Sequence, residues 1–521
     1  MGRQIRQAST LAAALLTGAI AGPVRADVTP AQVWDQWAGY LSSFGYTVEF
    51  EPVVDGDNLH FPVFEMTMYI PGDKATGVKG GTVTINMGEL ALVDLGDGTV
   101  SIELPGKMPI AVAGDGPGDD DFTADLTLTA MGHRTIASGD PGDITYDFSA
   151  ESLSVTLDQI SGKDGPSRMP GTVAITMEGA SGVNRLASDN GVTRINQALK
   201  MDRLAYDVAI SDPSSGHSGK VMWQGEITGL TTSSRGVVPP EVNPLAIDRA
   251  LANGYIVNTL IEFDAGNGVF GYADEKSETR MATTSQGGTF GLGMSATGLE
   301  YSVLSRDVSI SLSGTEVPFP LNTTAGALGL GIQLPVIAGA LEQPFGASIT
   351  VTDLDVPEAV WMMADPTNSL PHDPVTMEVA LSGKTRLFTD IMNEAAMRRL
   401  DKTGGAPGEL TALALEALRI RAAGAMIEAS ADLDIDNTKV SMFHPNMPAF
   451  GGTADVTLTG VTTLLNKLGQ LGMIPMQHAL IGAGMIQQLG RQGDEADEFS
   501  ADIRLSPAGT LTINDTPFPL Q

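Results

Sequence analysis

The chain contains no cysteine in its 521 residues. It therefore forms no disulfide, has no thiol nucleophile and cannot bind a metal ion through thiolates. The absence also excludes a lipid anchor attached to cysteine. A chain without cysteine is compatible with an oxidising compartment.

Aromatic residues are scarce, at 5% of the chain, although 42% of its residues are hydrophobic. Aliphatic side chains must therefore fill most of the core. Glycine is frequent, with 61 residues, which is typical of a chain with many turns. At this length we expect two or more domains.

Basic residues are also few, with 30 Lys and Arg against 62 Asp and Glu, and the net charge is −32. Residues 1–26 carry three arginines and no acidic residue, so removing them takes the net charge to −35. A surface of this charge repels nucleic acids and anionic membranes. We expect no nucleic-acid partner.

The N-terminus has the features of a secretory signal peptide. Arg3 and Arg6 precede a short apolar stretch from Leu11 to Gly22, and Val24-Arg25-Ala26 is a small-x-small cleavage site. The apolar stretch is shorter than the roughly 20 residues of a membrane-spanning helix, which argues against an uncleaved anchor. We predict cleavage after Ala26 and a periplasmic location.

No later segment is predicted to cross a membrane. The most apolar one, from Ala325 to Leu341, contains Gln333, Pro335 and four glycines. Its composition favours a glycine-rich strand.

The predicted mature chain opens with a helix. Thr29 and Gln32 form a Thr-x-x-Gln capping box around Pro30, and Gly45 is placed to end the helix. Apolar residues at helical spacing share one face: Val33, Trp34, Trp37, Leu41 and Phe44. This face predicts a helix docked on a sheet rather than a pair of tryptophans that bind a ligand.

Alternation of apolar and polar residues dominates the rest of the chain. It is clearest at 82–87, 123–129, 152–157, 172–177 and 453–458. Turn signals such as Asp55-Gly56-Asp57-Asn58 and Gly96-Asp97-Gly98 separate such segments. We predict a β-rich α+β protein with extended, curved antiparallel sheets and a few capping helices.

Similar segments recur at a nearly constant offset, which predicts an internal duplication. Gly45-Tyr46-x-Val48 matches Gly254-Tyr255-x-Val257, and Val100-Ser101-Ile102 matches Val308-Ser309-Ile310. Gly80-Gly81-Thr82 and Met87 likewise match Gly287-Gly288-Thr289 and Met294. A helix-like stretch, Pro244 to Asn253, opens the second half. We predict two β-rich halves, residues 27–236 and 237–521.

A repeated pattern in the second half of the chain predicts strand–helix–strand modules. Val379–Leu387 resembles Val456–Leu464, each being a strand and a glycine turn that lead towards a helix. The predicted helices include Leu410–Ala423 and Leu464–Gln470, whose apolar stripes would cover a sheet face.

Several of these segments resemble the secreted proteins grouped as domain of unknown function 2125. The Trp34/Trp37 helix with Gly45-Tyr46-Thr47-Val48 is similar to their mature N-terminus. Trp361-Met362-Met363, Asp365-Pro366 and Leu370-Pro371-His372-Asp373-Pro374 are similar to their central signature. The C-terminal likeness comprises Asp455–Gly460, Leu464–Leu471 and Thr510–Asn514, with Asn514-Asp515 in place of the usual Asn-Gly. The resemblance implies an exported protein of β-rich architecture and no catalytic residues.

The histidines have no metal-binding spacing. No histidine lies two, three or four residues from another histidine or from a plausible set of carboxylate ligands. The histidines are His60, His133, His217, His372, His444 and His478. His372 and Asp373 are adjacent and point apart on an extended chain. We predict no metal or cofactor site.

Two acidic segments have features of cation sites. Asp432-x-Asp434-x-Asp436 opens like a calcium loop, but Leu433 and Ile435 alternate with the acids, and Phe443 stands where that loop needs Glu. We predict a strand with an acidic face there. Asp115–Asp121 is loop-like, and both a cation site and a solvated turn remain open.

Two further patterns are incomplete. Gly383-Lys384-Thr385 resembles the end of a phosphate loop, but Glu378 occupies the position of its first glycine. Gly216-His217-Ser218-Gly219 resembles a serine-hydrolase turn, but Lys220 replaces the second glycine. We name no catalytic residue.

The sequence therefore favours a non-catalytic envelope protein with an apolar sheet face or groove. Its expected partner is a lipid-like amphiphile or another envelope protein, for which strand addition is one mode of binding. The alternative is an envelope hydrolase acting on glycan, ester or phosphate, because acidic residues are plentiful although no motif positions them.

Overall fold

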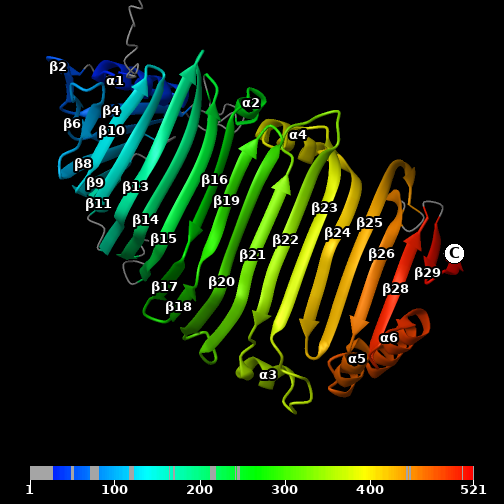
Figure 1. Ribbon diagram of the computed structural model, residues 1–521. Helices are drawn as coiled ribbons and strands as arrows, with labels where there is room; N and C mark the ends of the chain where they lie inside the picture. The colour runs from blue at the N-terminus through cyan, green and yellow to red at the C-terminus, as the bar shows by residue number, and fades with distance from the viewer. Residues whose placement is uncertain are drawn as a thin grey trace, which may run out of the picture.

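The computed structural model describes residues 27–48, 52–70, 81–115, 122–162, 165–167, 171–211, 219–240, 242, 247–441, 444, 447–506 and 509–519. Its strands form one long, curved antiparallel sheet, which is a single layer except at its N-terminal end (Figure 1). The predicted β-rich class with antiparallel strands is confirmed. The predicted signal peptide, residues 1–26, lies outside the described residues.

The C-terminal part of the sheet is a meander. From β20 to β26, each strand pairs with the next along the chain, and β26 then pairs with β28. The strands are β20 (Gly298–Gly314), β21 (Leu321–Leu334), β22 (Gln343–Leu354), β23 (Val375–Leu387), β24 (Gly408–Ala422), β25 (Ala425–Val440), β26 (Pro448–Thr459) and β28 (Glu498–Leu505). Short strands complete this edge: β27 (Arg491–Gln492), β29 (Thr510–Ile513) and β30 (Thr516–Pro519).

In the middle of the sheet, one long strand has two shorter strands beside it, placed end to end. β15 (Lys220–Val238) pairs with β16 (Ile256–Phe263) along one half and with β17 (Ala265–Ala273) along the other. β16 pairs in turn with β19 (Gly288–Ser295), and β17 pairs with β18 (Glu278–Ser285). Both β19 and β18 then pair with β20. On its other edge β15 pairs with β14 (Val192–Ser211), which pairs with β13 (Gly171–Asp189). The layer therefore remains continuous.

The N-terminal part divides at β11 (Asp143–Gly162), which pairs with β13 on one edge and with two separate branches on the other. One branch contains β10 (Arg134–Asp140), β7 (Val100–Glu103), β6 (Leu90–Asp94), β3 (Asn58–Phe61) and β2 (Val53–Asp55). The other contains β9 (Phe122–Met131), β8 (Lys107–Asp115), β5 (Gly81–Met87), β4 (Phe64–Ile70) and β1 (Tyr46–Val48). The short β12 (Gly165–Ser167) pairs with the end of β11.

Helix α1 (Pro30–Ser43) begins and ends as its sequence predicts. The Thr29 hydroxyl accepts from the Gln32 amide, and the Thr29 amide donates to the Gln32 side chain. Gly45 has φ +84° just after the helix. The apolar face of α1 packs into the largest buried cluster, which contains Val33, Phe61, Phe64, Leu92, Ile144, Tyr146 and Leu186, with Trp34, Trp37 and Leu41 beside it. The prediction that the tryptophans dock the helix is confirmed.

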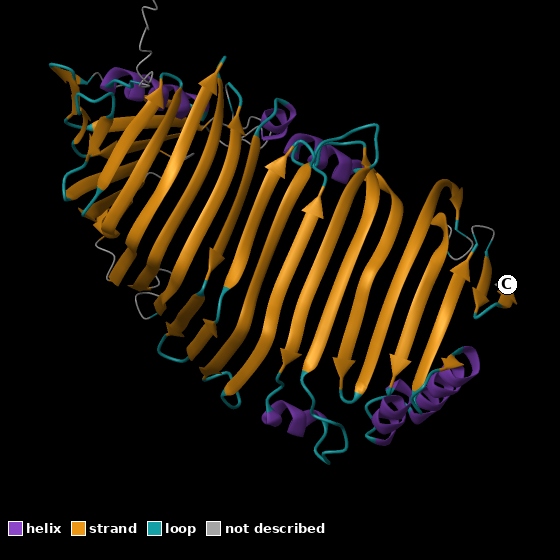
Figure 2. Ribbon diagram, in the orientation of Figure 1, coloured by secondary structure: helices purple, strands orange, loops and turns teal. Residues whose placement is uncertain are grey.

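The remaining helices lie at the ends of the strands (Figure 2). They are α2 (Ile247–Ala252), α3 (Glu358–Ala364), α4 (Glu394–Thr403), α5 (Val461–Gln470) and α6 (Met476–Leu489). The prediction that the C-terminal helices cover a sheet face is wrong, because α5 and α6 pack mainly on each other and touch only strand ends.

One predicted helix is a strand. The segment predicted as a helix, Leu410–Ala423, lies in β24 up to Ala422, although its Leu, Ala and Glu residues favour helix. β24 pairs along its length with β23 and β25, and a shift in register between Leu415 and Leu418 keeps both leucines on one face. Pairing on both edges outweighs local propensity here.

The two predicted strand–glycine–helix modules differ. Gly460 has φ +71° and precedes α5, as predicted. The turn predicted at Gly383 is wrong, because β23 runs straight through it. A Cβ at Gly383 would lie 2.4 Å from the Phe345 ring and 2.4 Å from the Ala412 carbonyl oxygen. Glycine is needed there because a neighbouring ring crosses the strand.

The structure does not confirm the predicted duplication. β16 pairs directly with β19, whereas the matching segments β1 and β5 are separated by β4. The segments on either side of residue 236 share one sheet, and β15 crosses that position.

The alternating segments, by contrast, are confirmed as strands β5, β9, β11, β13 and β26. The glycine-rich segment predicted as a strand from Ala325 to Leu341 is confirmed only as far as Leu334, where β21 ends.

Candidate functional site

The sheet has one apolar face that runs across its C-terminal half. Partners opposite each other in antiparallel strands share a face, and residues two apart on one strand share it too. One row of partners reads Ile261, Phe290, Val303, Leu330, Ile349, Val379 and Leu418. The next reads Leu292, Tyr301, Ile332, Ala347, Leu381 and Leu415, and a third reads Leu328, Val351, Met377, Ile420, Ile427, Leu458 and Phe499. We call these three rows the apolar face.

The opposite face carries the charges. Glu378, Arg419 and Glu428 follow one another in one row, and Arg419 pairs with both carboxylates at 3.4 and 2.9 Å. Glu300 and Gln333 are partners in another row, and their side chains are joined by a hydrogen bond of 3.3 Å. The described positions of the apolar face contain no charged residue.

The apolar face is open in its centre. Leu330, Ile349 and Leu381 are 39%, 42% and 36% exposed, and Figures 1 and 2 show no helix over these strands. Strands lie about 4.8 Å apart and rows about 7 Å apart, so the face measures about 40 Å by about 15 Å between β16 and β28. This is at the upper limit of the apolar patches that folded monomers leave exposed, and such patches mark binding sites.

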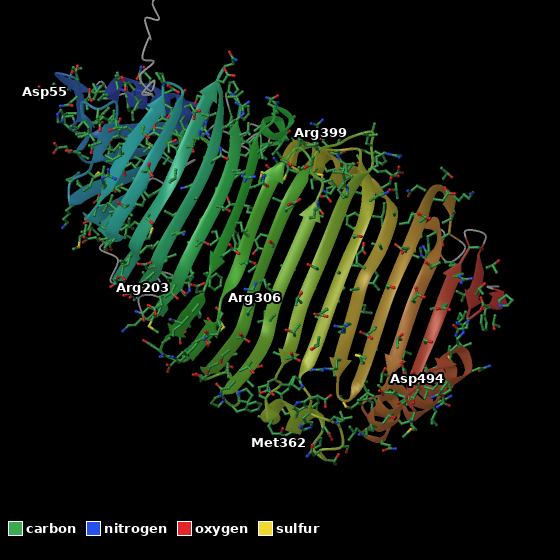
Figure 3. The ribbon with its side chains drawn as sticks, viewed as in Figure 1. Asp55, Arg203, Arg306, Met362, Arg399 and Asp494 are labelled. Atoms are coloured by element: carbon green, nitrogen blue, oxygen red, sulfur yellow. The ribbon has the colours of Figure 1, made fainter. Side chains whose placement is uncertain are left out.

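Two helices add apolar side chains at one end of the strands. Met362 and Met363 on α3 are exposed, and so are Leu480, Ile481 and Met485 on α6. Figure 3 shows Met362 beyond the ends of the central strands, and Figure 1 shows α3 and α6 at the same edge of the sheet. These side chains extend the exposed apolar surface around that edge.

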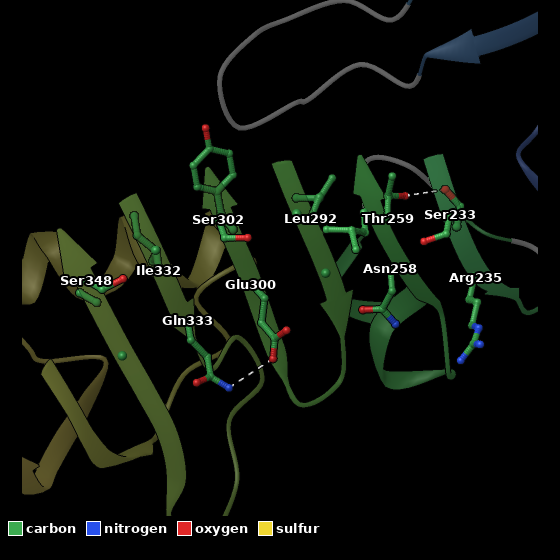
Figure 4. A pocket seen from close by; sticks show the side chains of 18 of the residues that line it. Ser233, Arg235, Asn258, Thr259, Leu292, Glu300, Ser302, Ile332, Gln333 and Ser348 are labelled. Atoms are coloured by element: carbon green, nitrogen blue, oxygen red, sulfur yellow. Dashed lines mark hydrogen bonds between the residues drawn. The ribbon is translucent and has the colours of Figure 1, made fainter. Parts of the chain in front are cut away.

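A shallow hollow of about 1030 Å³ crosses strands β13 to β23. On β13 its lining residues are Val183 and Arg185, which share the charged face with Glu300 and Gln333. Small residues such as Gly291, Gly331 and Ala380 form its floor. Figure 4 shows Arg235, Asn258, Glu300 and Gln333 in one line across the strands. The hollow therefore lies on the charged face, and its lining combines these polar side chains with apolar ones such as Val183 and Leu260.

The segment that carries the central signature folds into a compact cluster after α3. The His372 ring stacks on Trp361 with ring centroids 4.4 Å apart, and its Nδ1 lies 3.1 Å from Glu358 Oε2. Asp365 is buried and accepts hydrogen bonds from the Leu370 amide at 2.6 Å and from the Thr367 hydroxyl at 3.1 Å.

The charge of Asp365 in this cluster serves to hold the loop in shape. Burial raises the pKa of the Asp365 carboxyl, but hydrogen bonds from Leu370, Thr367 and Ser369 outweigh it and hold the pKa below its usual value. The charged carboxylate therefore ties the loop together. Among the described residues, the polar side chains nearest His372 are the carboxylates of Glu358 and Asp365.

The other candidate residues are dispersed. His133 bonds to Thr135, and Asp432 and Asp434 lie exposed on β25, where the predicted strand is confirmed. Lys384 lies within β23, so no phosphate loop forms there. Residues 116–121 of the acidic loop and His217-Ser218 lie outside the described residues. Within the described part of the chain, no group of three or more His, Asp or Glu side chains could hold a metal ion.

The sequence predicts that an apolar sheet face or groove exists, but it does not predict which residues form it. Each strand's alternation is readable, but the rows depend on the register of strands that are distant in sequence. No protein-family model matches the chain, and comparison with curated proteins finds no similar sequence. Among the described helices, none is both long enough and apolar enough to span a bilayer.

Proposed function

We propose that this protein is an exported, non-catalytic binding module of the cell envelope, and that its apolar face holds the hydrocarbon chains of an amphiphile. The observation that carries the proposal is the uncharged run of apolar rows from β16 to β28. The periplasmic location rests on the N-terminal signal.

The chemistry of the face favours hydrocarbon over a protein partner. Protein interfaces have about one hydrogen bond per 100–200 Å² and a polar rim. The three rows of the apolar face offer little besides aliphatic, aromatic and small side chains, with the phenol of Tyr301 as an exception. Acyl chains need no hydrogen bonds and gain free energy in proportion to the apolar area that they cover.

The test uses two neighbouring residues on opposite faces. Leu381→Lys places a charge in the apolar face, whereas Ser382→Lys places it on the charged face, where Ser382 already bonds to Glu416. We expect Leu381→Lys to weaken binding of dodecyl maltoside, measured by calorimetry below its micellar concentration, by about tenfold or more. Ser382→Lys should bind like the wild type.

Two outcomes would contradict the proposal. One is wild-type protein that binds no amphiphile and from which mass spectrometry of native material recovers none. The other is equal loss of binding in both variants. If the wild type instead forms a dimer that Leu381→Lys disrupts, a second copy of the chain is the occupant of the face.

No specific observation among the described residues supports the alternative of a hydrolase. Membership of the family of domain of unknown function 2125 stays a proposal that rests on the sequence signature around Trp361 and His372.

A further inference from the structure

A strip of uncharged polar residues interrupts the apolar face where it approaches α1. The second apolar row continues from Leu292 through Thr259, Ser234, Gln197 and Asn184. We call these last four residues the polar strip. Figure 4 shows Thr259 beside Leu292 on the neighbouring strand, so the strip begins directly where the apolar row ends.

The strip is closed at its far end. The register partner of Asn184 is Tyr146, which is buried in the core under α1, with its ring 6.0 Å from Trp37. The Tyr146 hydroxyl donates to Gln36 at 2.7 Å, and Gln36 donates to the Leu186 carbonyl at 2.9 Å. An extended ligand on the face would therefore meet α1 at this end and cannot pass it.

The strip has unused hydrogen-bonding capacity. The Asn184 Oδ1 atom is buried without a partner among the described residues, which is unfavourable unless a donor reaches it. Ser234 and Thr259 bond to each other at 3.0 Å, and each hydroxyl can accept a further bond. Gln197 is exposed.

The surroundings of the strip are uncharged. The neighbouring rows on this face contain Gly182, Leu199, Thr232 and Ile261 on one side and Leu186, Ile195, Gly236 and Val257 on the other. Among the described residues of these rows, no cation can balance a phosphate and no carboxylate can balance an amine. A charged group would therefore lose hydration without compensation.

We infer that the polar strip receives the head group of the bound amphiphile, and that this head group is uncharged and rich in hydroxyl groups, as in a sugar- or glycerol-headed lipid. The inference rests on the proposed function and adds an orientation to it. The head lies against Asn184 and Gln197 near α1, and the chains extend across β19 towards β26.

The test compares probes whose chains have the same length and whose heads differ. Dodecyl maltoside has an uncharged sugar head, and lauroyl lysophosphatidylglycerol has an anionic one. We expect wild-type protein, at concentrations below micelle formation, to bind the maltoside about tenfold more tightly in calorimetry. Gln197→Leu should reduce this preference to about twofold or less while the protein still binds both probes.

Asn196→Leu is the matched control, because Asn196 is the next residue on β14 and lies on the charged face. It should keep the full preference. Ser234→Ala provides a second, smaller change in the strip, and circular dichroism checks that each variant is folded. Equal binding of both probes by the wild type, or an unchanged preference in Gln197→Leu and Ser234→Ala, would overturn the head-group assignment and leave the proposed function standing. Absence of binding by either probe would overturn the proposed function itself.

Discussion

At the scale of single residues, local hydrogen bonds decide where segments begin and how loops close. Thr29 and Gln32 satisfy each other's backbone amides at the start of α1, and this arrangement is readable from four residues of sequence. The Asp365 loop is different. Its aspartate could be read as part of a signature, but the amides that converge on it depend on the folded path of residues 365–370.

Removal of the capping hydroxyl should destabilise the N-terminal core. We expect Thr29→Ala to lower the free energy of unfolding by about 1 kcal/mol, because the Gln32 amide loses its acceptor at a helix end. Urea unfolding followed by tryptophan fluorescence measures this, since Trp34 and Trp37 lie beside the core. Gln32→Ala removes only the reciprocal bond and should cost less. A Thr29→Ala variant as stable as the wild type would contradict the capping role.

Asp365 should make stability depend on pH in the acid range. Its folded-state pKa is lower than its ordinary value of 3.8, so the stability it contributes is fully present above that value. The contribution is lost as the pH falls through the lowered folded-state pKa. We expect Asp365→Asn to melt below the wild type at pH 7 and the difference to shrink as the pH falls below 3.8. A difference that stays constant from pH 7 to pH 3 would contradict the assignment.

At the scale of elements, two-residue alternation predicts strands where turns bound them, as in β5, β9 and β26. It fails in β24, where the composition is helical and only the neighbouring strands determine the conformation. Strands β16 and β17 lie end to end along β15, and β19 and β18 lie end to end along β20, without a local sequence signature for this arrangement. Their order depends on contacts between residues far apart in the chain.

Replacing two glycines that have different surroundings by alanine tests how closely the strands pack. At Gly383 an added methyl group would collide with the Phe345 ring and the Ala412 carbonyl, and Gly383→Ala should cost about 1–3 kcal/mol. Gly39 lies exposed within α1 with nothing near its Cβ position, and Gly39→Ala should gain about 0.5–1 kcal/mol. Urea unfolding measures both variants. A neutral Gly383→Ala would show that the ring does not cross the strand as described.

At the scale of the whole molecule, the sheet from β13 to β28 is one layer with chemically distinct faces. The composition, rich in aliphatic residues and poor in aromatic ones, agrees with such a face, and the alternation predicts that one exists. Its position could not be predicted, because the rows arise only when strands from β16 to β28 align in register. The interruption by the polar strip depends on the same alignment.

The absence of cysteine allows the apolar face to be tested directly. A single cysteine at position 381 or 382, labelled with a polarity-sensitive dye, reports on one face of β23 at a time. We expect dodecyl maltoside, added below its micellar concentration, to shift the emission of the Leu381→Cys conjugate to shorter wavelength and to leave the Ser382→Cys conjugate unchanged. Equal shifts at both positions, or no shift at position 381, would contradict an amphiphile-binding apolar face.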